Sequence, residues 1–565
     1  MSEFEFIAAL TLIFVVAALL LIAATRFSLP TVPFYLLAGV AFGAAGNVVG
    51  IVDEGQLLDL AQWGIAFLVF AFAVELEPLE GRSLRRDSLI VSVVQLVVTG
   101  FIMFGIGLGL GLDGLNALYF TLAGTLSSSL VALSLLERRV RLRSLHERMA
   151  ESIHFVEDVV AIVAVLLLSA FVYAEGSLVP LGAGIAMIAG ALAFRHFLFE
   201  RFVTAAESDV EILMLTGVSL IIGFIAISEL AGVSIVVGAF AAGIAVASEY
   251  PHDVEMVDAI GYLEDFFTPI FFITLGALVS IPTLETLGIG ALLLVAVFVL
   301  NPLVTYLVLR WRSYDSRTAT LAGYNLDQIS EFALIIAIEA LAAGVLVPEL
   351  FDAIVLAAIV TMLGSTLTTR YAEAGFQRLV DRGVFETDLE RVRERSQVSD
   401  DLRNHVIVTE YDREGQQVVE ACERADQPYV VIESDPHRED AVREHCENYV
   451  LGDVMTESTW TVANVDEATL VVGTVARESW AEQILALDID ADVIVRAVDV
   501  ESGTELLEQG ALFVAIPDEL AAERLAEQIE SVLIGDTSLE ELRDHGEERL
   551  ERAVEYGPSD VDRLR

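Results

Sequence analysis

The chain has 565 residues, 55% of them hydrophobic, and a formal net charge of −49. It is too apolar for a single soluble domain and too long for a single hydrophobic core. It contains no lysine, and residues 401–565 carry 41 acidic side chains against 13 arginines, a balance that excludes nucleic-acid binding through phosphate neutralisation.

The same composition indicates the compartment. A dense carboxylate surface without lysine suits a salt-rich cytosol, in which charges are screened over short distances, so we expect a halophilic host. Two cysteines, Cys422 and Cys446, are too few for a disulfide framework and indicate a reducing compartment. The first apolar run is long enough to span a bilayer and has no basic segment before it, which argues against a cleavable signal.

Apolar segments follow one another along the first two thirds of the chain. A helix that crosses a bilayer needs about 20 apolar residues, and thirteen segments come close to this length. They are residues 3–24, 31–50, 57–76, 88–110, 116–137, 153–174, 178–199, 211–230, 233–249, 264–280, 286–309, 320–343 and 350–370. We therefore expect a multi-pass helical membrane domain.

The loops between these segments differ in charge. Arginines follow the odd-numbered segments, with the acidic loop at residues 251–261 as an exception, and acids alone follow the even-numbered segments. The arginines are Arg26, Arg82, Arg85, Arg86, Arg138, Arg139, Arg141, Arg143, Arg148, Arg195, Arg201, Arg310, Arg312 and Arg317, and the acids are Asp53, Glu54, Asp113, Glu175, Glu285 and Glu349. Because arginines concentrate in cytoplasmic loops, this pattern predicts an N-terminus outside the cell membrane and a cytoplasmic C-terminal part.

Two adjacent carboxylates, Glu157 and Asp158, lie in the sixth segment. A charged carboxylate at bilayer depth costs about 2.5–3.5 kcal/mol on insertion scales, so such a group normally faces a partner or a water-filled cavity and indicates a functional site. The alternative is that both acids lie at the start of a helix, where the helix dipole favours anions. His154 and the residues before it would then begin that helix.

Two other segments are interrupted by small and polar residues. Such interruptions are typical of broken membrane helices, whose freed backbone groups face an ion in transporters with repeated halves. The alternatives are helix packing through small residues in the fifth segment and a cap at the membrane surface in the twelfth. The residues are Gly124, Thr125, Ser127, Ser128 and Ser129 in the fifth segment, and Asn325, Asp327, Gln328, Ser330 and Glu331 in the twelfth.

The sequence periodicity changes after the last apolar segment. The expected organisation is a transmembrane domain at residues 1–371, a charged linker at 372–402, an α/β domain at 403–516 and an acidic helical tail at 517–565 that is a dimer element or a solvated end. Short β-rich runs at residues 405–408, 429–432, 468–472 and 491–496 alternate with helical stretches. This alternation predicts βαβ units and a parallel, Rossmann-like sheet.

Seven short pieces of the apolar part occur together in one order. They are residues 29–30 (LP) with 34–39 (FYLLAG), 67–70 (FLVF) with 74–76 (VEL), 126–129 (LSSS), 155–158 (FVED), 238–243 (GAFAAG), 269–276 (PIFFITLG) and 330–333 (SEFA). Together they resemble the monovalent cation:proton antiporter-2 family, which includes the glutathione-gated potassium efflux antiporters. The resemblance implies a thirteen-helix transporter with inverted repeats, a mobile core, a dimerising scaffold and two crossed broken helices. It also implies that Asp158 binds the cation and the proton alternately.

The chemistry of a buried carboxylate fits that role, because desolvation favours its protonated form and a bound cation favours its charged form. The chain departs from its relatives where Glu157 precedes the aspartate and where Asn301 replaces a basic residue common in the eleventh segment. Glu157 is therefore either a second proton carrier or a neutral hydrogen-bond donor. The candidate ligands of the cation are Asp158, Glu157, Ser128, Ser129, Thr125, Gln328, Glu331 and Asn301.

The α/β part contains three short pieces, residues 405–408 (HVIV), 431–436 (VIESDP) and 451–453 (LGD). With these pieces it resembles the N-lobe of regulator-of-potassium-conductance domains, the nucleotide-binding regulatory domains of potassium transporters and channels. The dinucleotide loop of that fold is G-x-G-x-x-G, and here it begins with Glu410 and Asp412 and keeps Gly415. Because two carboxylates would repel phosphate, we expect no NAD bound in the usual way and no other certain cofactor. Glu433 or Asp435 could still reach a ribose or adenosine, and the alternative is a domain that serves dimerisation alone.

The function that these observations favour is the exchange of K⁺ or Na⁺ for H⁺ by a homodimeric secondary antiporter in the membrane. The competing hypothesis is a ligand-gated monovalent cation channel, but no selectivity-filter sequence is present. A membrane-embedded enzyme is disfavoured, because the sequence has no His/Glu metal motif and no nucleophile with a base.

Overall fold

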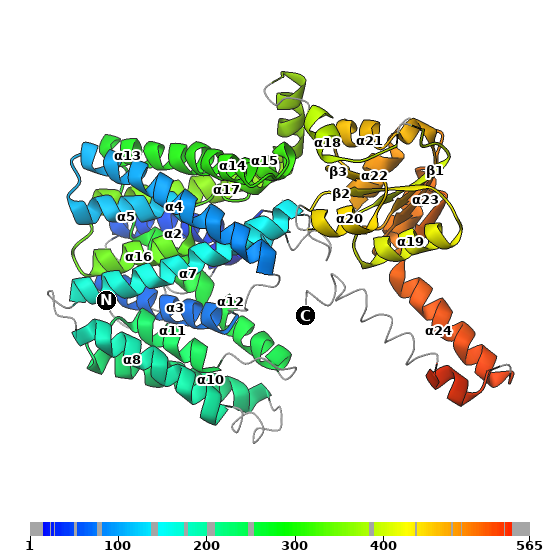
Figure 1. Ribbon diagram of the computed structural model, residues 1–565. Coiled ribbons are helices and arrows are strands. Elements are labelled where there is room, and N and C mark those ends of the chain that lie inside the picture. Colours follow the sequence, from blue (N-terminus) through cyan, green and yellow to red (C-terminus); the bar gives the residue numbers. More distant parts are fainter. Residues whose placement is uncertain are drawn as a thin grey trace.

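The computed structural model consists of a helical body and a smaller α/β domain (Figure 1). The described residues are 15–22, 24–26, 29–49, 54–75, 82–136, 145–173, 179–199, 210–246, 253–383, 389–399, 401–435, 438–475, 478–487, 489–535 and 537–544. Among the predicted loop residues, Asp53, Arg138, Arg139, Arg141, Arg143, Glu175 and Arg201 lie outside these ranges.

The helical body has one, two or three consecutive helices at every predicted segment from the second to the thirteenth. In chain order these are α2 (Val32–Val49), α3 (Glu54–Glu75), α4 (Arg82–Gly109), α5 (Gly114–Thr125), α6 (Ser129–Leu136), α7 (Leu145–Tyr173), α8 (Val179–Phe194), η1 (Arg195–Phe199), α10 (Val210–Leu230), α11 (Ile235–Val246), α12 (Asp253–Ala277), α13 (Leu284–Val295), η2 (Ala296–Leu300), α14 (Asn301–Trp311), α15 (Ser316–Tyr324), α16 (Glu331–Ala342) and α17 (Pro348–Asp381). In the first predicted segment, residues 15–22 and 24–26 are helical.

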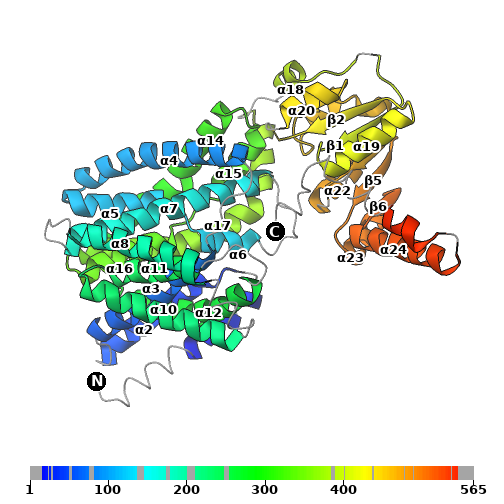
Figure 2. The same cartoon turned by 60° about the horizontal axis from the view of Figure 1, so that its bottom comes forward.

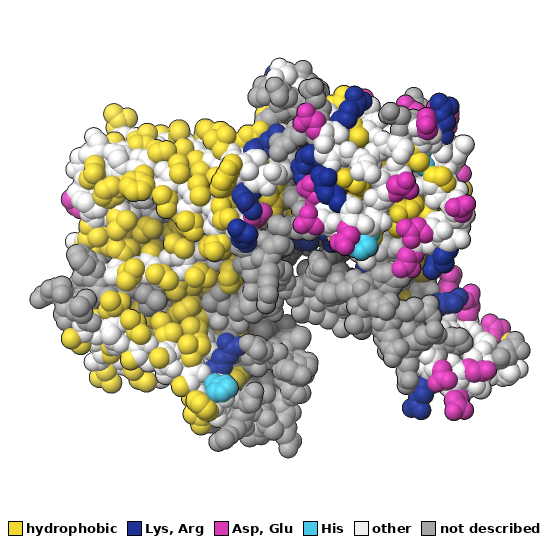
Figure 3. Space-filling model, viewed as in Figure 1, with side chains coloured by type: hydrophobic (Ala, Val, Ile, Leu, Met, Phe, Trp, Pro, Cys, Tyr) yellow, Lys and Arg dark blue, Asp and Glu magenta, His cyan; other side chains and the backbone are white. Residues whose placement is uncertain are grey.

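The outside of this body is apolar. Within the described residues, five helical spans are long and apolar enough to cross a membrane, namely Leu57–Val74, Arg86–Gly109, Val179–Phe199, Leu284–Trp311 and Pro348–Val380. On the face shown in Figure 3, apolar side chains cover much of the body, whereas charged side chains gather on the α/β domain. Phe101 on α4 is 78% exposed and Leu230 at the end of α10 is 90% exposed, as suits helices that face lipid. The prediction of a polytopic helical membrane protein is confirmed.

Two of the predicted membrane segments are broken in the middle. The fifth is interrupted between α5 and α6 at residues 126–128, and the twelfth between α15 and α16 at residues 325–330. The two interruptions cross as antiparallel extended strands, because Ser127 and Ile329 form a β-bridge. The prediction of two crossed broken helices is therefore confirmed. The helix α7 packs beside this crossing, against α6, α15 and α16.

The α/β domain contains one fully parallel sheet of six strands in the order β3-β2-β1-β4-β5-β6. The strands are β1 (His405–Thr409), β2 (Tyr429–Glu433), β3 (Tyr449–Leu451), β4 (Ala468–Gly473), β5 (Asp492–Arg496) and β6 (Phe513–Ala515). The helices between them are α19 (Arg413–Arg424), α20 (Glu439–His445), α21 (Glu457–Val462), η3 (Val465–Glu467), α22 (Glu478–Leu485) and α23 (Val500–Glu508). This confirms the predicted Rossmann-like arrangement. The sequence did not reveal β3 and β6 as strands, because three residues carry no visible periodicity.

Both faces of this sheet are covered. Val406 and Val408 of β1 pack with α19 and α20 on one face, and Ile407 packs with α21, α22 and α23 on the other. Residues that alternate between two buried faces read as a continuous apolar run, which is what the sequence shows.

Two helices connect and extend the domains. The helix α17 continues to Asp381, beyond the predicted end of the membrane part, and α18 (Leu389–Arg395) leads into the sheet domain. After β6 the chain forms α24 (Pro517–Leu533), which has no buried residue and projects from the domain (Figure 2).

Candidate functional site

At the first break, donors from other segments satisfy the backbone carbonyls that have lost their helical partners. Asn301 Nδ2 donates to Gly124 O at 3.0 Å, and Gln95 Nε2 donates to Thr125 O at 3.0 Å. Ser330 N, from the second break, donates to Leu126 O at 3.1 Å. A carbonyl that lost its helical partner inside a membrane would cost several kcal/mol if left alone, so these donors make the break possible. Asn301 thus contacts the broken helix rather than the acid pair.

The acid pair faces the break from α7. Glu157 and Asp158 are 1% and 3% exposed, and they lie 12 and 13 residues after Leu145, at which α7 begins. The alternative that these acids cap the start of a helix is therefore wrong. Glu157 Oε2 accepts a hydrogen bond from Ser127 N at 2.9 Å and a short one from Ser127 Oγ.

A third carboxylate approaches from the second broken helix. Glu331 Oε1, at the first residue of α16, accepts hydrogen bonds from Ser129 Oγ at 2.8 Å and Leu130 N at 3.2 Å. Asp158 lies close to the Ser129 hydroxyl and within electrostatic range of Glu331 and Glu157. The structure thus brings together acids from the sixth and twelfth predicted segments around serines of the fifth.

Four buried oxygens at this site have no hydrogen-bond partner among the described residues: Glu157 Oε1, Asp158 Oδ1, Glu331 Oε2 and Asn301 Oδ1. Oxygen atoms are what an alkali cation needs in place of its water shell. The described part of the chain holds no group of three or more His, Cys, Asp or Glu side chains arranged to bind a metal ion. Carbonyl, hydroxyl or water oxygens would therefore have to complete the coordination of a cation.

The remaining predicted ligands form hydrogen bonds within their own segment or between the two breaks. Thr125 Oγ1 donates to Thr121 O of its own helix at 2.9 Å, and Ser128 Oγ accepts from Val131 N at 3.2 Å. Gln328 Nε2 bridges the two breaks by donating to Ser128 O at 3.0 Å, which holds the crossing in place.

Two buried side chains at the crossing were absent from the predicted site. Asp327 has an exposed fraction of 0%, and neither of its carboxylate oxygens has a hydrogen-bond partner among the described residues, so it is not a cap at the membrane surface. His154, one turn before Asp158 on α7, is 3% exposed and contacts both broken helices. The spacing of three and four residues from His154 to the two acids was a signal of one shared helix face.

His154 links the acid pair to the second break. Its Nε2 lies 3.1 Å from Asn325 O, and its Nδ1 lies 3.0 Å from Ser127 Oγ. Because a carbonyl can accept but not donate, Nε2 carries a proton. The single hydroxyl proton of Ser127 then goes either to Glu157 or to His154 Nδ1.

Both contacts of the Ser127 hydroxyl can be hydrogen bonds only when Glu157 or His154 carries one additional proton. If Ser127 donates to Glu157, then His154 Nδ1 must be protonated, and if Ser127 donates to His154, then Glu157 must be protonated. In either arrangement the net charge of Glu157, Ser127 and His154 is zero. These three residues, which we call the Glu157 triad, form one hydrogen-bonded unit that a single shared proton would complete, and Asp158 is the acid beside them.

Comparison with known proteins identifies the family of the helical body. Residues 11–372 match the family described as sodium/hydrogen exchanger, transmembrane. The chain belongs to this exchanger family. Residues 406–517 match the TrkA-N domain, so this exchanger carries a Rossmann-like domain of that type after its membrane part.

Sequence similarity to known proteins extends over most of this chain. The glutathione-regulated potassium-efflux system protein KefC of Enterobacter sp. (strain 638) is 28% identical over 514 residues, which are 87% of this chain and 80% of that protein. The putative cation/proton antiporter YbaL of Escherichia coli (strain K12) is 26% identical over 552 residues, 92% of this chain and 97% of that protein.

Among solved structures, the sodium proton antiporter MjNhaP1 from Methanocaldococcus jannaschii is 16% identical, with a TM-score of 0.43 over 65% of this chain and 97% of its own. The TrkA-N domain of the inner membrane protein ybaL from Escherichia coli is 28% identical, with a TM-score of 0.22 over 23% of this chain and 98% of its own.

In the TrkA-N domain, an acidic side chain of the same domain binds a backbone N–H group of the dinucleotide loop. Glu433, at the end of β2, is 1% exposed, and its two oxygens accept hydrogen bonds from Tyr411 N at 2.9 Å and Asp435 N at 2.7 Å. In dinucleotide-binding relatives of this fold, the acid at this position binds a ribose hydroxyl and the loop N–H groups face phosphate. Here the acid and the loop bind each other.

The loop itself is shaped around Glu410. This residue has a φ of 66° and is 6% exposed, and its carboxylate accepts a hydrogen bond from Ser434 Oγ at 2.7 Å. A Cβ at position 415 would lie 2.0 Å from Glu410 O, which explains why Gly415 stays a glycine. Arg438 Nη1 lies 3.9 Å from Glu410 Oε2 and 3.7 Å from Glu433 Oε2, so one guanidinium forms ion pairs with two buried acids.

Replacing Glu410 by glutamine is expected to stabilise the protein at alkaline pH. Burial, and then the charge of Glu433, raise the pKa of Glu410 well above its usual range. An unfolded glutamate ionises at about pH 4.3, so the stability contributed by the Glu410 proton is complete below that pH and is lost as the pH rises through the raised pKa. We expect Glu410→Gln to raise the midpoint of thermal unfolding by about 2–4 °C at pH 8 and by less at pH 5.

Tryptophan fluorescence during heating measures this effect, since Trp460 and Trp480 lie in the same domain. The matched control is Glu508→Gln, because Glu508 is exposed. Equal shifts for Glu410→Gln at the two pH values would show that Glu410 ionises as an ordinary surface acid.

Proposed function

We propose that the protein is a secondary antiporter that exchanges K⁺ or Na⁺ for H⁺ across the cell membrane by alternating access, and that it is not an enzyme. The observation that carries this proposal is the buried carboxylate of Asp158 beside two crossed broken helices. Asp158, Glu157 and Glu331 each have one buried oxygen without a hydrogen-bond partner among the described residues. Membership of the sodium/hydrogen exchanger family supports it.

Asp158 is the proposed exchange site. When a cation leaves, its carboxylate is left desolvated and takes up a proton, and when the proton leaves, the carboxylate takes up a cation. One site that holds either ligand, but not both, produces obligatory exchange when it is opened to each side in turn. Ser129 and Glu331 belong to the same proposed site, since Ser129 lies next to both acids.

The Glu157 triad sets the proposed stoichiometry. Because its shared proton satisfies each contact of the Ser127 hydroxyl, Glu157 has no need of a separate cation, and one proton exchanges for one cation at Asp158. The exchange is then electroneutral. His154 thereby takes the place of the basic residue that relatives carry at the position of Asn301.

The proposed ion is K⁺ in the first place and Na⁺ in the second. The KefC relative is named for potassium efflux, whereas the matched family is named for sodium. The orientation proposed from the loop arginines is an N-terminus outside and a cytoplasmic TrkA-N domain. A homodimer is proposed as well, and α24 offers exposed apolar side chains for it, including Leu525, Ile529 and Leu533.

Proteoliposomes test the proposal. Vesicles loaded with K⁺ and diluted into K⁺-free buffer are expected to acidify inside, as reported by a trapped pH dye, without any protonophore. Repeating the experiment with Na⁺ identifies the preferred ion, and choline-loaded vesicles are the control. Acidification that appears only after a protonophore is added would indicate a cation conductance, and the channel hypothesis would replace exchange.

A further inference from the structure

The carboxyl edge of the TrkA-N sheet faces the membrane body. In open α/β sheets this edge, beyond the ends of the strands, is where ligands bind. In this chain Asp435 follows β2 and Asp453 follows β3, and both contact arginines of the membrane body instead. The contact region lies where α15 and α17 approach the sheet domain (Figure 1).

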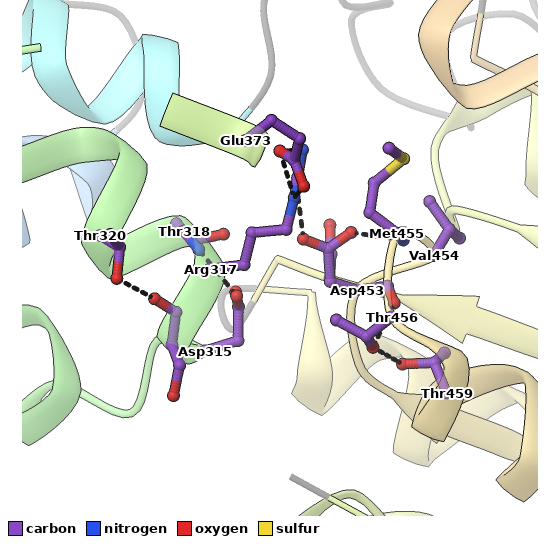
Figure 4. Close-up of polar contacts among 12 residues, drawn as sticks. Asp315, Arg317, Thr318, Thr320, Glu373, Asp453, Val454, Met455, Thr456 and Thr459 are labelled. Atoms are coloured by element: carbon purple, nitrogen blue, oxygen red, sulfur yellow. Dashed lines mark hydrogen bonds and ion pairs between the residues drawn. The ribbon is translucent and has the colours of Figure 1, made fainter. Parts of the chain in front are cut away.

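The central contact is made by Arg317 on the first turn of α15 (Figure 4). Its Nη1 donates to Asp453 Oδ2 at 2.8 Å, and its Nε donates to Glu373 Oε2 of α17 at 2.9 Å. The side chains of Arg317 and Asp453 are 6% and 4% exposed. A buried guanidinium held by two carboxylates is screened little by salt, so we expect the contact to persist at high salt concentration.

The loop that presents Asp453 is held by its own hydrogen bonds. Asp453 Oδ1 accepts from Met455 N at 2.9 Å, which leaves Oδ2 directed at Arg317. Thr456 and Thr459 are joined by a hydrogen bond of 2.8 Å, and a Cβ at Gly452 would lie 2.5 Å from Thr459 Oγ1. These contacts hold the Asp453 carboxylate in the orientation in which it meets Arg317.

A second set of contacts lies beside the first. Arg148 near the start of α7 lies 3.9 Å from Asp435, and Arg395 of α18 donates to Ser313 O, just before α15, at 3.2 Å. The two membrane helices reached by the domain are those of the proposed ion site. Helix α7 carries Glu157 and Asp158, and α15 ends at the second break.

We propose that the carboxyl edge of the TrkA-N sheet is a docking surface whose partner is the cytoplasmic ends of α7 and α15 of the same chain. At this edge the domain binds arginines of the membrane body, whereas other members of the fold bind nucleotides there. The dinucleotide loop, whose groups already form hydrogen bonds with Glu433 and Ser434, fits this role because it needs no nucleotide. Docking restrains the two helices that meet at the ion site and slows their movement between the two access states. This last step rests on the proposed exchange function.

A charge swap at the central contact tests the proposal in the full-length protein. Asp453→Arg places two arginines together and is expected to undock the domain, whereas Asp453→Arg combined with Arg317→Glu lets Arg at position 453 pair with Glu at 317 and with Glu373. Hydrogen–deuterium exchange in residues 316–324 and 452–456 is expected to rise at least fivefold in the single variant and to return to the wild-type rate in the double variant. Asp466→Arg, at an exposed acid of the same domain, is the control.

The cation-driven proton flux of the same variants gives the second readout. It is expected to rise roughly fivefold or more in Asp453→Arg and to fall back in the swap, in the usual range of allosteric coupling. Unchanged deuterium exchange in Asp453→Arg, or a swap that fails to restore it, would overturn docking. If protection responds as expected but the wild-type protein moves no protons, docking stands and the proposed function fails.

Discussion

Replacing Asp158 by asparagine is expected to reduce cation-driven proton movement in proteoliposomes to the level of protein-free vesicles. Asparagine is nearly the same size and keeps a hydrogen-bond acceptor near Ser129, but it can neither release a proton nor carry the charge that attracts a cation. The protein should remain folded, because the substitution removes a desolvated charge instead of creating one.

The matched control is Asp352→Asn, a carboxylate in the same membrane body that accepts a hydrogen bond from Ser280 N and lies on α17 away from the crossing. This control is expected to retain exchange. Exchange that survives in Asp158→Asn, or is lost equally in both variants, would remove Asp158 from the central place in the mechanism.

Replacing His154 by leucine is expected to lower exchange at least tenfold, and adding Glu157→Gln is expected to restore most of it. Leucine removes the partner that shares the proton of the Glu157 triad, so Glu157 becomes an unbalanced buried charge beside Asp158. Glutamine removes that charge and can still accept the hydrogen bond from Ser127 N.

A double-mutant cycle on the transport rate measures this coupling. A tenfold non-additive effect corresponds to about 1.4 kcal/mol, within the range of residues in one hydrogen-bond network. Additive losses from His154→Leu and Glu157→Gln would mean that the two side chains act independently. Currents on solid-supported membranes add a readout of charge: the wild-type protein is expected to show none during exchange, whereas sustained currents would contradict a neutral triad.

The sequence was sufficient to predict the elements that have strong periodicity and the residues that are energetically costly to place in a bilayer. Twenty-residue apolar runs predicted the membrane helices, and acids in such runs marked Glu157, Asp158 and Glu331, because the bilayer leaves few reasons for a carboxylate to be there. The polar interruptions predicted both breaks. These are local signals: the membrane helices and both breaks were confirmed in the fold, and the three acids lie buried beside the breaks, where their role stays a prediction.

Tertiary pairing was beyond the reach of the sequence. Arg317 counted as one of many cytoplasmic arginines, and its partner Asp453 lies 136 positions later in the chain, so the pairing depends on how the two domains fold together. Asn301 was considered as a missing counter-charge, but its amide instead satisfies a carbonyl of the broken helix. His154 was visible on the same helix face as the acids, but its role emerged from two acceptors on other segments, Ser127 and Asn325.

The central claim is that one carboxylate, Asp158, holds either the cation or the proton. The most direct test is the apparent KM for the cation, measured by initial proton flux in proteoliposomes across a series of pH values. Competition at one site predicts that the apparent KM rises linearly with proton concentration on the cation side while the maximal rate stays constant. A pH-independent apparent KM with a changing maximal rate would place the two ligands at separate sites and contradict the mechanism.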